Sequence, residues 1–314
     1  MENEGWNIIR NGLNVNNRRQ AKQTREYQTY RIIKDKIYFY LTLFLSFVVL
    51  IPLVLLVFKI IKEGVKHINL DLFFSSEPSQ TEVILSQLAG EILPGGIANG
   101  LVGGIYIILI ALALAIPIGL FSGIFFYTQR THPFIRLFLY ANNIVLGIPS
   151  IITGLIIYLW VVRHLYSFSA LAGGIALAIV VFPFISRCTV QSLSKLPVGI
   201  EESCIALGAR YSQVVFKVLI PSIGKKITGY ILYAAARGLG ETAPLLFTTW
   251  GASIINLHIN RPTSTLSLQI WSFFNNPYST QLMWSAALIL FIIILILHIA
   301  AKLLIGDEKL YDNE

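Results

Sequence analysis

Long uncharged apolar runs alternate with polar connections along most of the chain. A helix needs about 20 residues to cross the ~30 Å hydrocarbon core of a bilayer, and five runs reach that length: 37–58, 97–127, 137–162, 165–186 and 282–301. A sixth, 227–249, qualifies except for Arg237 and Glu241. Continuous apolar runs argue against a transmembrane barrel, whose strands are shorter and alternate in polarity. The pattern predicts an all-α polytopic membrane protein with six transmembrane helices.

The same pattern divides the chain into three parts. Residues 1–36 form a polar N-terminal arm, residues 37–305 the membrane domain, and residues 306–314 a polar tail. No small-residue cleavage site follows the first apolar run, so we expect this run to remain as an anchor at the periphery rather than to be removed as a signal peptide.

Prolines and small residues indicate how the spans are shaped and packed. A proline removes a helix hydrogen bond and favours a kink, and five of the six spans contain one: Pro52, Pro117, Pro149, Pro183 and Pro244. Rows of small residues let helix backbones approach closely. Such rows occur in the second span (Ala111, Ala115, Gly119, Gly123) and the fourth (Ala170, Gly174, Ala178). They predict tight packing, as in any polytopic protein, and do not by themselves indicate transport.

Composition and charge agree with a membrane location. The chain has 314 residues, of which 55% are hydrophobic and 13% charged, against roughly 25% charged residues in an average soluble domain. Eighteen Lys and Arg residues fall in the terminal segments and the connections on one side of the membrane, and five fall on the other side. Because cytoplasmic loops carry the excess of positive charge, we expect both termini in the cytoplasm. The net charge of +8 then reflects topology and attraction to anionic lipid; the basic residues are too dispersed to indicate nucleic-acid binding.

The sequence offers little for catalysis or metal binding. Its two cysteines, Cys188 and Cys204, fall near the cytoplasmic face, where a disulfide is not expected. Its five histidines are scattered and form no HExxH pattern. We therefore expect no metal, no cofactor in this chain and no enzymatic activity of its own.

The longest cytoplasmic connection, residues 197–221, has a mixed character. Apolar residues recur at roughly helical spacing within a segment too polar to enter lipid, which predicts one or two short amphipathic helices at the membrane surface. Glu201 and Glu202 suit a helix N-terminus, and Gly208 with Ala209 would end the helix. Pro221 would begin the fifth span. A helix that only floats on the lipid headgroups is the alternative.

This connection resembles the EAA loop of ABC importer permeases, whose pattern is Glu-Ala-Ala, three residues, Gly, nine residues, Ile, one residue, Leu-Pro. Here Glu202-Ser203-Cys204 is followed after three residues by Gly208, and after nine more by Val218, Leu219, Ile220 and Pro221. The spacing is intact and the substitutions are mild. The resemblance implies a MetI-like permease core in which residues 197–221 are a coupling loop, with Glu202, Ser203, Cys204 and Gly208 docking on an ATP-hydrolysing subunit.

A second resemblance concerns the stretch ARGLGETAPLLFT at residues 236–248. It is similar to the fifth span of phosphate-specific ABC importer permeases. The segments GIPSIITGL (147–155) and FPFISRCT (182–189) agree more weakly. The family often has Glu three residues after the arginine that corresponds to Arg187, whereas this chain has Val190. An ion pair or proton relay that uses that glutamate is therefore not carried over, and Gln191 is at best a partial substitute.

The resemblance implies partners as well as a substrate. They are a related membrane permease subunit, two cytoplasmic ATPase subunits, an external phosphate-binding protein and the lipid of a bacterial inner membrane. The chain contains no GxxxxGK[ST] motif for cradling nucleotide phosphates. We therefore expect ATP to bind and be hydrolysed at the partner subunits.

Arg237 and Glu241 raise the question of what two charges do within a span. An arginine at the bilayer centre costs at least ~2.5 to 3.5 kcal/mol on insertion scales, so it usually faces protein or a water-filled path. The two residues are four apart and near enough to pair on one helix face. A guanidinium fits oxyanions such as phosphate, and its pairing with a glutamate would temper its charge. We predict a substrate path formed by Arg237, Glu241 and Arg187; the alternative is a purely structural ion pair.

The predicted function is thus a permease subunit of an ATP-driven phosphate importer. Within the same class, the alternative is an ABC permease for another oxyanion. From other classes, the alternatives are a secondary transporter or channel without ATPase partners, which has no reason to retain the EAA-like spacing, and a membrane-embedded enzyme, which would have few catalytic groups.

Overall fold

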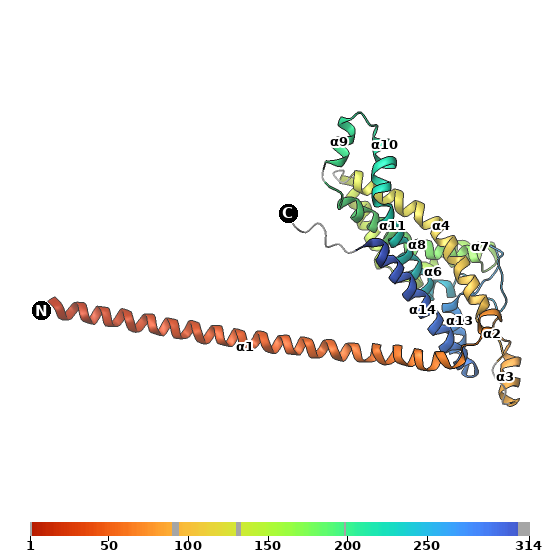
Figure 1. Cartoon of the computed structure of the whole chain (residues 1–314), viewed down its shortest axis with the longest axis horizontal. Coiled ribbons are helices and arrows are strands. Elements are labelled where there is room, and N and C mark those ends of the chain that lie inside the picture. Colours follow the sequence, from red (N-terminus) through yellow and green to blue (C-terminus); the bar gives the residue numbers. More distant parts are fainter. Residues whose placement is uncertain (1, 90–93, 130–132, 198, 307–314) are drawn as a thin grey trace. The chain divides into compact units, whose positions relative to one another are not determined.

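The computed structural model describes residues 2–89, 94–129, 133–197 and 199–306. Regular structure in this part of the chain is helical, and one isolated bridge joins Trp250 and Thr263. The elements are α1 (Glu2–Gly64), η1 (Val65–His67), α2 (Leu70–Phe74), α3 (Gln80–Ala89), α4 (Ala98–Thr128), α5 (Pro133–Gly147), α6 (Ser150–Ile157), η2 (Tyr158–Val162), α7 (Arg163–Leu165), α8 (Ala170–Ser194), α9 (Ile200–Ala206), α10 (Tyr211–Val214), η3 (Val215–Leu219), α11 (Ile220–Gly240), α12 (Ala243–Leu246), α13 (Leu266–Phe274), η4 (Pro277–Ser279) and α14 (Thr280–Ile305). Figure 1 labels most of the α-helices. The all-α prediction is confirmed.

The chain forms two compact units, residues 1–59 and 60–314. The first unit contains residues 2–59 of the long helix α1, which continues through Pro52 and includes the first predicted span. Its boundary does not test the predicted arm at residues 1–36, which stays a prediction. Most of the predicted tail, from residue 307 onward, lies outside the described residues.

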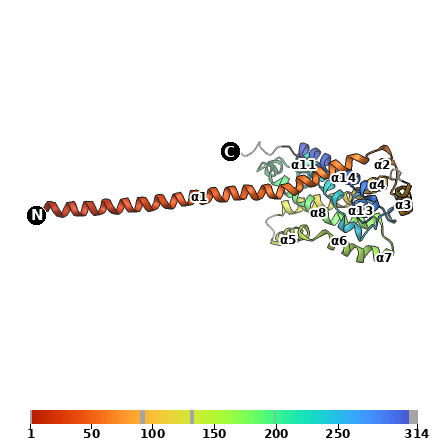
Figure 2. The ribbon, with the colours of Figure 1, turned by 90° about the horizontal axis from the view of Figure 1, so that it is seen from below.

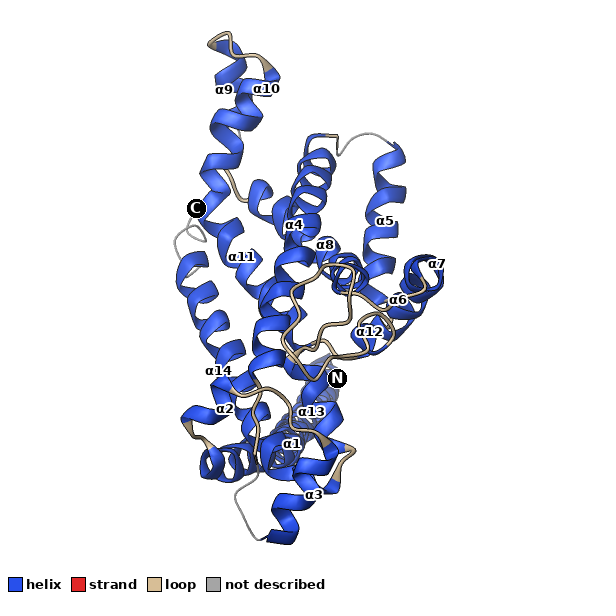
Figure 3. Ribbon diagram, turned by 90° about the vertical axis from the view of Figure 1, so that its right-hand side faces the viewer, coloured by secondary structure: helices blue, strands red, loops and turns tan. Residues whose placement is uncertain are grey.

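The second unit is a helical bundle. Figure 3 shows α9 and α10 at one end of this bundle and α2, α3 and α13 at the other, with α4, α8, α11 and α14 running between them. Figure 2 shows α5, α6 and α7 along one side and α11 with α14 on the opposite side. The central helix is α8, which packs along both α4 and α11 and is the most buried of the candidate membrane spans.

The predicted rows of small residues form the contact between α4 and α8. Ala111, Ala115 and Ala170 are completely buried. A Cβ on Gly119 would lie 2.8 Å from Cβ of Ile185, and one on Gly123 would lie 2.6 Å from Cβ of Thr189. Such contacts leave no room for a side chain, so glycine is needed at both positions for the two backbones to approach as they do.

Carbonyl groups from the 250–262 loop cap the first turn of α8. The backbone N–H of Ala170 donates to the carbonyl oxygen of Arg261 at 3.0 Å, and that of Leu171 donates to Ile259 at 2.9 Å. The side chain of Ser169 accepts a further N–H of the same turn. The donors that a helix start normally leaves unsatisfied are therefore bound by a distant loop.

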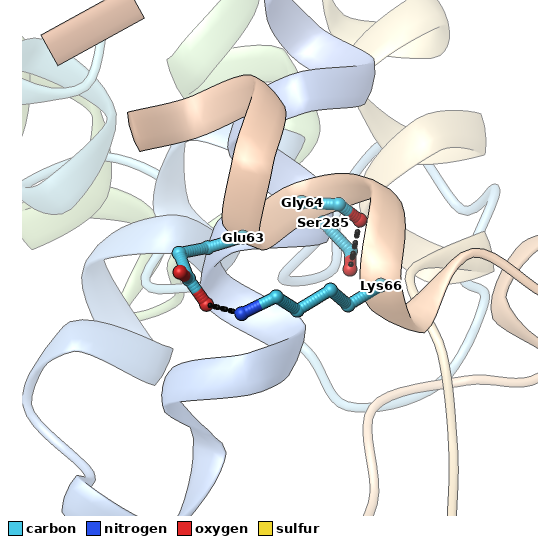
Figure 4. A network of polar contacts seen from close by, with 4 residues as sticks. All are labelled: Glu63, Gly64, Lys66 and Ser285. Atoms are coloured by element: carbon cyan, nitrogen blue, oxygen red, sulfur yellow. Dashed lines mark hydrogen bonds and ion pairs between the residues drawn. The ribbon is translucent and has the colours of Figure 1, made fainter. Parts of the chain in front are cut away.

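The last turn of α1, which belongs to the second unit, is fastened to α14. Figure 4 shows Ser285 Oγ donating to the carbonyl oxygen of Gly64, a buried contact of 3.0 Å. A Cβ on Gly64 would lie 2.7 Å from Cβ of Leu288, so only glycine permits this approach. The exposed pair of Lys66 and Glu63, 2.7 Å apart, lies beside it.

The predicted number of six spans is not confirmed. Within the described residues, four helices are long and apolar enough to cross a membrane, or five if one bent pair counts as a span. The four lie at residues 34–67, 98–128, 170–194 and 280–305. Each of the four overlaps one predicted span (37–58, 97–127, 165–186 and 282–301). Helix α8 begins five residues later than expected because Ser169 is its N-cap, and it ends eight residues later, at Ser194.

The third predicted span, 137–162, is broken at Pro149. Helix α5 ends at Gly147, α6 begins at Ser150, and the two are bent by 98°. Pro149 is extended (φ −55°, ψ 129°) and disfavours a helical conformation at Ile148 before it. The prediction of one kinked helix across this segment was therefore wrong, because Pro149 separates two helices.

The fifth predicted span, 227–249, is also wrong in its second half. Helix α11 begins earlier, at Ile220 with Pro221 in its first turn, and ends at Gly240, where Glu241 turns to an extended conformation (φ −75°, ψ 128°). Pro244 then lies in the first turn of the short helix α12. A proline fits there because its missing N–H is not needed, so Pro244 begins a helix and does not kink one. Pro117 and Pro183 do lie inside α4 and α8.

Candidate substrate path and coupling loop

Arg237 and Glu241 lie at the end of α11 rather than in the middle of a straight span. Arg237 is in the last turn of α11, and Glu241 is its C-cap residue. The buried Gly238 packs against α4 and α8, and its carbonyl oxygen accepts the N–H of Glu241 at 3.2 Å. The expectation that both residues share one regular helix face is therefore corrected: the backbone leaves the helix between them.

The two side chains form a loose ion pair. Nε of Arg237 lies 3.9 Å from Oε1 of Glu241, and their side chains are 45% and 20% exposed. This distance is too long for a hydrogen bond, and exposed ion pairs add little stability. The ion pair therefore contributes little to the stability of this region. Much of the guanidinium remains accessible at the surface of the chain, where an anion could approach it.

Hydroxyl groups from α13 hold the backbone of Glu241. Ser267 Oγ donates to the carbonyl oxygen of Glu241 at 2.9 Å and lies 3.0 Å from Oγ1 of Thr265, the N-cap of α13. These hydroxyl groups are buried. The end of α11 is therefore fixed by neutral hydrogen bonds, so the carboxylate is not needed to hold the backbone.

Arg187 is exposed on α8 and lies at a different level from Arg237. A Cβ on Gly238 would be 3.8 Å from Val181, so Val181 marks the level of Arg237 on α8. Arg187 is six residues further along α8, about 9 Å at 1.5 Å per residue. The structure therefore separates these two predicted path residues along the bundle axis.

The coupling-loop segment forms the two predicted short helices, α9 and α10. Glu202 lies in the first turn of α9, and Gly208 follows that helix with a φ of +85°, a conformation that favours glycine. Glu202, Ser203 and Gly208 are exposed, whereas Cys204 is half-buried against the cluster that contains Leu219. Three of the four predicted docking residues thus face outward and Cys204 faces the bundle. Their docking role itself stays a prediction.

Exposed apolar side chains accompany these residues at the tip of the loop. Ile205 is 50% and Leu207 89% exposed, while Val214 and Leu219 are completely buried or nearly so. The amphipathic pattern is therefore split between two surfaces: the second half of the segment packs on the bundle, and the first half presents Ile205 and Leu207 outward.

Neither a metal site nor a disulfide is formed by the described residues. They contain no group of three or more His, Cys, Asp or Glu side chains that could hold a metal ion. Cys188 and Cys204 are both free thiols.

Sequence reasoning missed a buried amide network at the α13 end of the bundle. Gln269 Nε2 donates to Oδ1 of Asn99 at 2.7 Å, and Nδ2 of Asn99 donates to the carbonyl oxygen of Ala252 at 2.6 Å. The backbone N–H of Glu77 also donates to Asn99. The sequence feature that could have indicated this network is Gln269, an amide side chain inside the apolar stretch LSLQIWSFF. This network ties α4, α13 and two connecting segments together.

Comparison with known proteins gives both a family and a fold. The family model for the binding-protein-dependent transport system inner membrane component matches residues 115–306. A protein of Haemophilus influenzae named phosphate transport system permease protein PstA is 30% identical over 257 residues, covering 81% of this chain and 87% of the relative. A PstA of Xylella fastidiosa is 33% identical over 258 residues, covering 80% and 85%.

A solved structure supports the same architecture. The chain superposes on a structure of the MetNI methionine ABC transporter in an inward-facing conformation with a TM-score of 0.53 and 20% identity, covering 67% of this chain and 94% of the other. At this identity the likeness concerns the fold alone. It agrees with the predicted MetI-like core, and the family match extends over the C-terminal part of α4 and all of α11 and α14. Together with the PstA relatives, these matches establish that the chain belongs to the family of binding-protein-dependent transport system inner membrane components.

Proposed function

We propose that this chain is one of two membrane subunits of an ATP-driven importer that moves phosphate across a bacterial inner membrane. The second membrane subunit would be a related permease, and two cytoplasmic ATPase subunits would bind and hydrolyse ATP. An external phosphate-binding protein would deliver the substrate. The names of the relatives support phosphate as the substrate, and the family description supports delivery by a binding protein. Both termini would be cytoplasmic.

The single observation that carries the transport role is the accessible guanidinium of Arg237. It is 45% exposed at the end of α11, and its contact with Glu241 is a loose 3.9 Å ion pair. A planar guanidinium can bind two phosphate oxygens at once, and the nearby carboxylate lowers the attraction enough for release. A site on a translocation path must attract its ion and still let it leave.

The coupling role rests on the geometry of the α9 segment. Glu202, Ser203 and Gly208 are exposed at the end of the bundle where α9 and α10 lie (Figure 3), and Ile205 and Leu207 add apolar area. A protein groove suits this combination of a short helix, one carboxylate and an apolar tip. Cys204 would support the helix from the bundle side instead of touching the ATPase subunit.

Phosphate uptake by the whole complex tests this proposal. Arg237→Gln removes the charge and keeps polarity, so uptake of labelled phosphate should fall by about 100-fold, since both electrostatic attraction and two-point binding are lost. Arg261→Gln is the matched control, because Arg261 is exposed on the 250–262 loop and only its backbone is used structurally.

Normal uptake by an assembled Arg237→Gln complex would refute the path. Competition by sulfate equal to that by unlabelled phosphate would favour the other-oxyanion alternative, and uptake without an ATPase subunit would favour the secondary transporter.

A further inference from the structure

Lys226 and Arg237 project from the same side of α11, so that a line parallel to the helix axis joins them. The two residues are eleven positions apart, which is close to three turns at 3.6 residues per turn, so their side chains leave the helix within about 20° of each other and about 16 Å apart along the axis. Lys226 is in the second turn of α11, toward the end of the bundle that carries α9 and α10.

Two tyrosines flank this line, each packed on a different neighbouring helix. The ring of Tyr233 contacts His298 of α14 edge-on, with centroids 5.0 Å apart. The ring of Tyr230 contacts Phe184 of α8 in the same manner at 6.5 Å. On the helix wheel the two tyrosines lie about 30° to either side of the line from Lys226 to Arg237. The line therefore runs along the seam between α14 and α8.

The burial of Lys226 differs from that of its neighbour. Lys225 is exposed, as expected of a lysine that only marks the cytoplasmic side, whereas Lys226 is half-buried. No carboxylate of a described residue lies within ion-pair distance of Lys226. Withdrawing an ammonium group from water is unfavourable unless an anion or a hydrogen-bond acceptor compensates, so this position is suited to a transient anion.

Arg187 adds positive charge at the same level. It follows Phe184 by less than one helical turn on α8, in the direction of the α9 and α10 end. Because Phe184 contacts Tyr230, Arg187 falls near the level of Tyr230 and Lys226 rather than that of Arg237. Arg187 and Lys226 thus form a second level of positive charge along the bundle axis. This second cationic level lies closer to the coupling loop than Arg237 does, which explains why Arg187 is separated from Arg237.

We propose that Lys226, together with Arg187, forms a second phosphate-binding site on the inner half of the path. This inference rests on the proposed function, in which Arg237 and Glu241 bind the anion first. The ammonium group of lysine offers three donors without a fixed plane, which suits a site that receives and quickly releases an anion. Passage between successive weak sites is how ion pathways combine binding with conduction.

Three variants of the complete complex, compared in membrane vesicles, test the inner site. Lys226→Gln should lower the maximal rate of phosphate uptake by about tenfold, the effect of losing one charge-assisted contact. The half-saturating phosphate concentration should change little, because capture occurs at Arg237. Lys226→Arg keeps the charge and should stay within about twofold of the parent. Lys225→Gln removes the same charge one residue away, about 100° around the helix, and should also transport normally.

A charge-rescue experiment covers the case in which Lys226→Gln fails to assemble. Lys226→Cys is modified either with an aminoethyl thiosulfonate, which restores an ammonium group, or with a methyl thiosulfonate, which does not. Only the aminoethyl adduct should recover uptake. The parent chain treated in the same way controls for Cys204, which is half-buried, and Cys188, which is buried.

The outcomes separate the inner site from the proposed function. Equal rates for Lys226→Gln and Lys225→Gln, or equal recovery by both adducts, would overturn the inner site, and the proposed function would stand if Arg237→Gln still abolished uptake. A parent complex that takes up no phosphate would overturn both. An Arg237→Gln complex that transports normally would refute the path and, with it, the inner site.

Discussion

The loose contact between Arg237 and Glu241 determines what each side chain is expected to contribute. If the pair served only to lock α11, either single substitution would lower the stability of the complex, because the remaining charge would be left without a partner. At 3.9 Å, with 45% of the arginine side chain exposed, the pair is too weak to be such a lock. The backbone of Glu241 is moreover held by Ser267. These observations favour a role for both charges in transport.

Glu241→Gln should therefore slow release rather than abolish binding. Arg237 would hold phosphate more strongly without its neighbouring carboxylate, so the maximal uptake rate should fall several-fold, about what one exposed charge contributes, and the half-saturating concentration should fall with it. Initial rates over a range of phosphate concentrations give both quantities.

The double variant Arg237→Gln, Glu241→Gln is the control for this prediction. It restores a neutral pair of nearly the same volume, so a structural pair would be relieved while a transport site would stay inactive. Transport at the parent rate by the double variant would show that Arg237 is a packing residue.

The sequence indicated the two candidate charges here but not their geometry. A pair four residues apart in an apolar run indicated the site, and Gly208 correctly indicated the end of α9. The end of α11 between Arg237 and Glu241 depends on contacts that the local pattern does not contain, namely Ser267 of α13 and the packing of Gly238 on α4. The apolar run resumes at residues 243–247, so the hydropathy pattern does not mark the end of α11.

At the level of elements, α9 and its flanking glycines offer a test of docking with a matched control. Gly199 and Gly208 both have positive φ, +96° and +85°, and neither has atoms near its would-be Cβ. Asp at either position should cost a similar amount of strain, about 1–3 kcal/mol. Only Gly208→Asp should also reduce co-purification of the ATPase subunit, since it adds bulk and charge beside the exposed Leu207.

Glu202→Lys should have the same effect as Gly208→Asp, because a reversed charge at an interface centre costs several kcal/mol. The measurements are the amount of ATPase subunit retained after detergent purification and the phosphate uptake of vesicles. Unchanged retention in both variants, or equal losses with Gly199→Asp, would show that the segment is not the coupling helix.

The helix boundaries show where apolar periodicity is sufficient and where it is not. The spans at α4 and α14 were predicted to within four residues at each end, because each is one long apolar run. The span at α8 was predicted five residues too early at its start and eight residues too early at its end. The segment 137–162 is equally apolar, yet α5 and α6 meet at 98° because an extended proline interrupts the run. Hydropathy alone does not distinguish a proline that lies inside a continuous helix, such as Pro117 in α4, from one that separates two helices, such as Pro149.

At the level of the whole molecule, the orientation in the membrane can be tested by surface labelling. Asn260 and Ser194 are both exposed, at opposite ends of α8, one in the capping loop and the other at the helix C-terminus. A cysteine at position 260 should react with an impermeant maleimide in intact cells, and one at position 194 only after the cells are opened. This orientation is predicted from the excess of Lys and Arg on the cytoplasmic side.

The parent chain, with Cys188 buried and Cys204 half-buried, sets the background of this labelling. Reversed reactivity of the two sites would place α9 outside the cell. It would thereby remove the basis for coupling to a cytoplasmic ATPase and for the direction assigned to the two cationic levels.

The capping of α8 has a consequence for how the protein is made. The N–H groups of Ala170 and Leu171 are bound by carbonyl groups of Arg261 and Ile259, which the ribosome adds much later than α8 itself. Backbone donors without partners are costly in lipid. The nascent α8 must therefore keep its first turn at the aqueous boundary or inside the insertion machinery until α11, α12 and the 250–262 loop have been synthesised. The first turn of the central helix α8 thus obtains its hydrogen-bond acceptors only after residues 259–261 have been synthesised. Maturation of this membrane domain is therefore tied to synthesis of the final third of the chain.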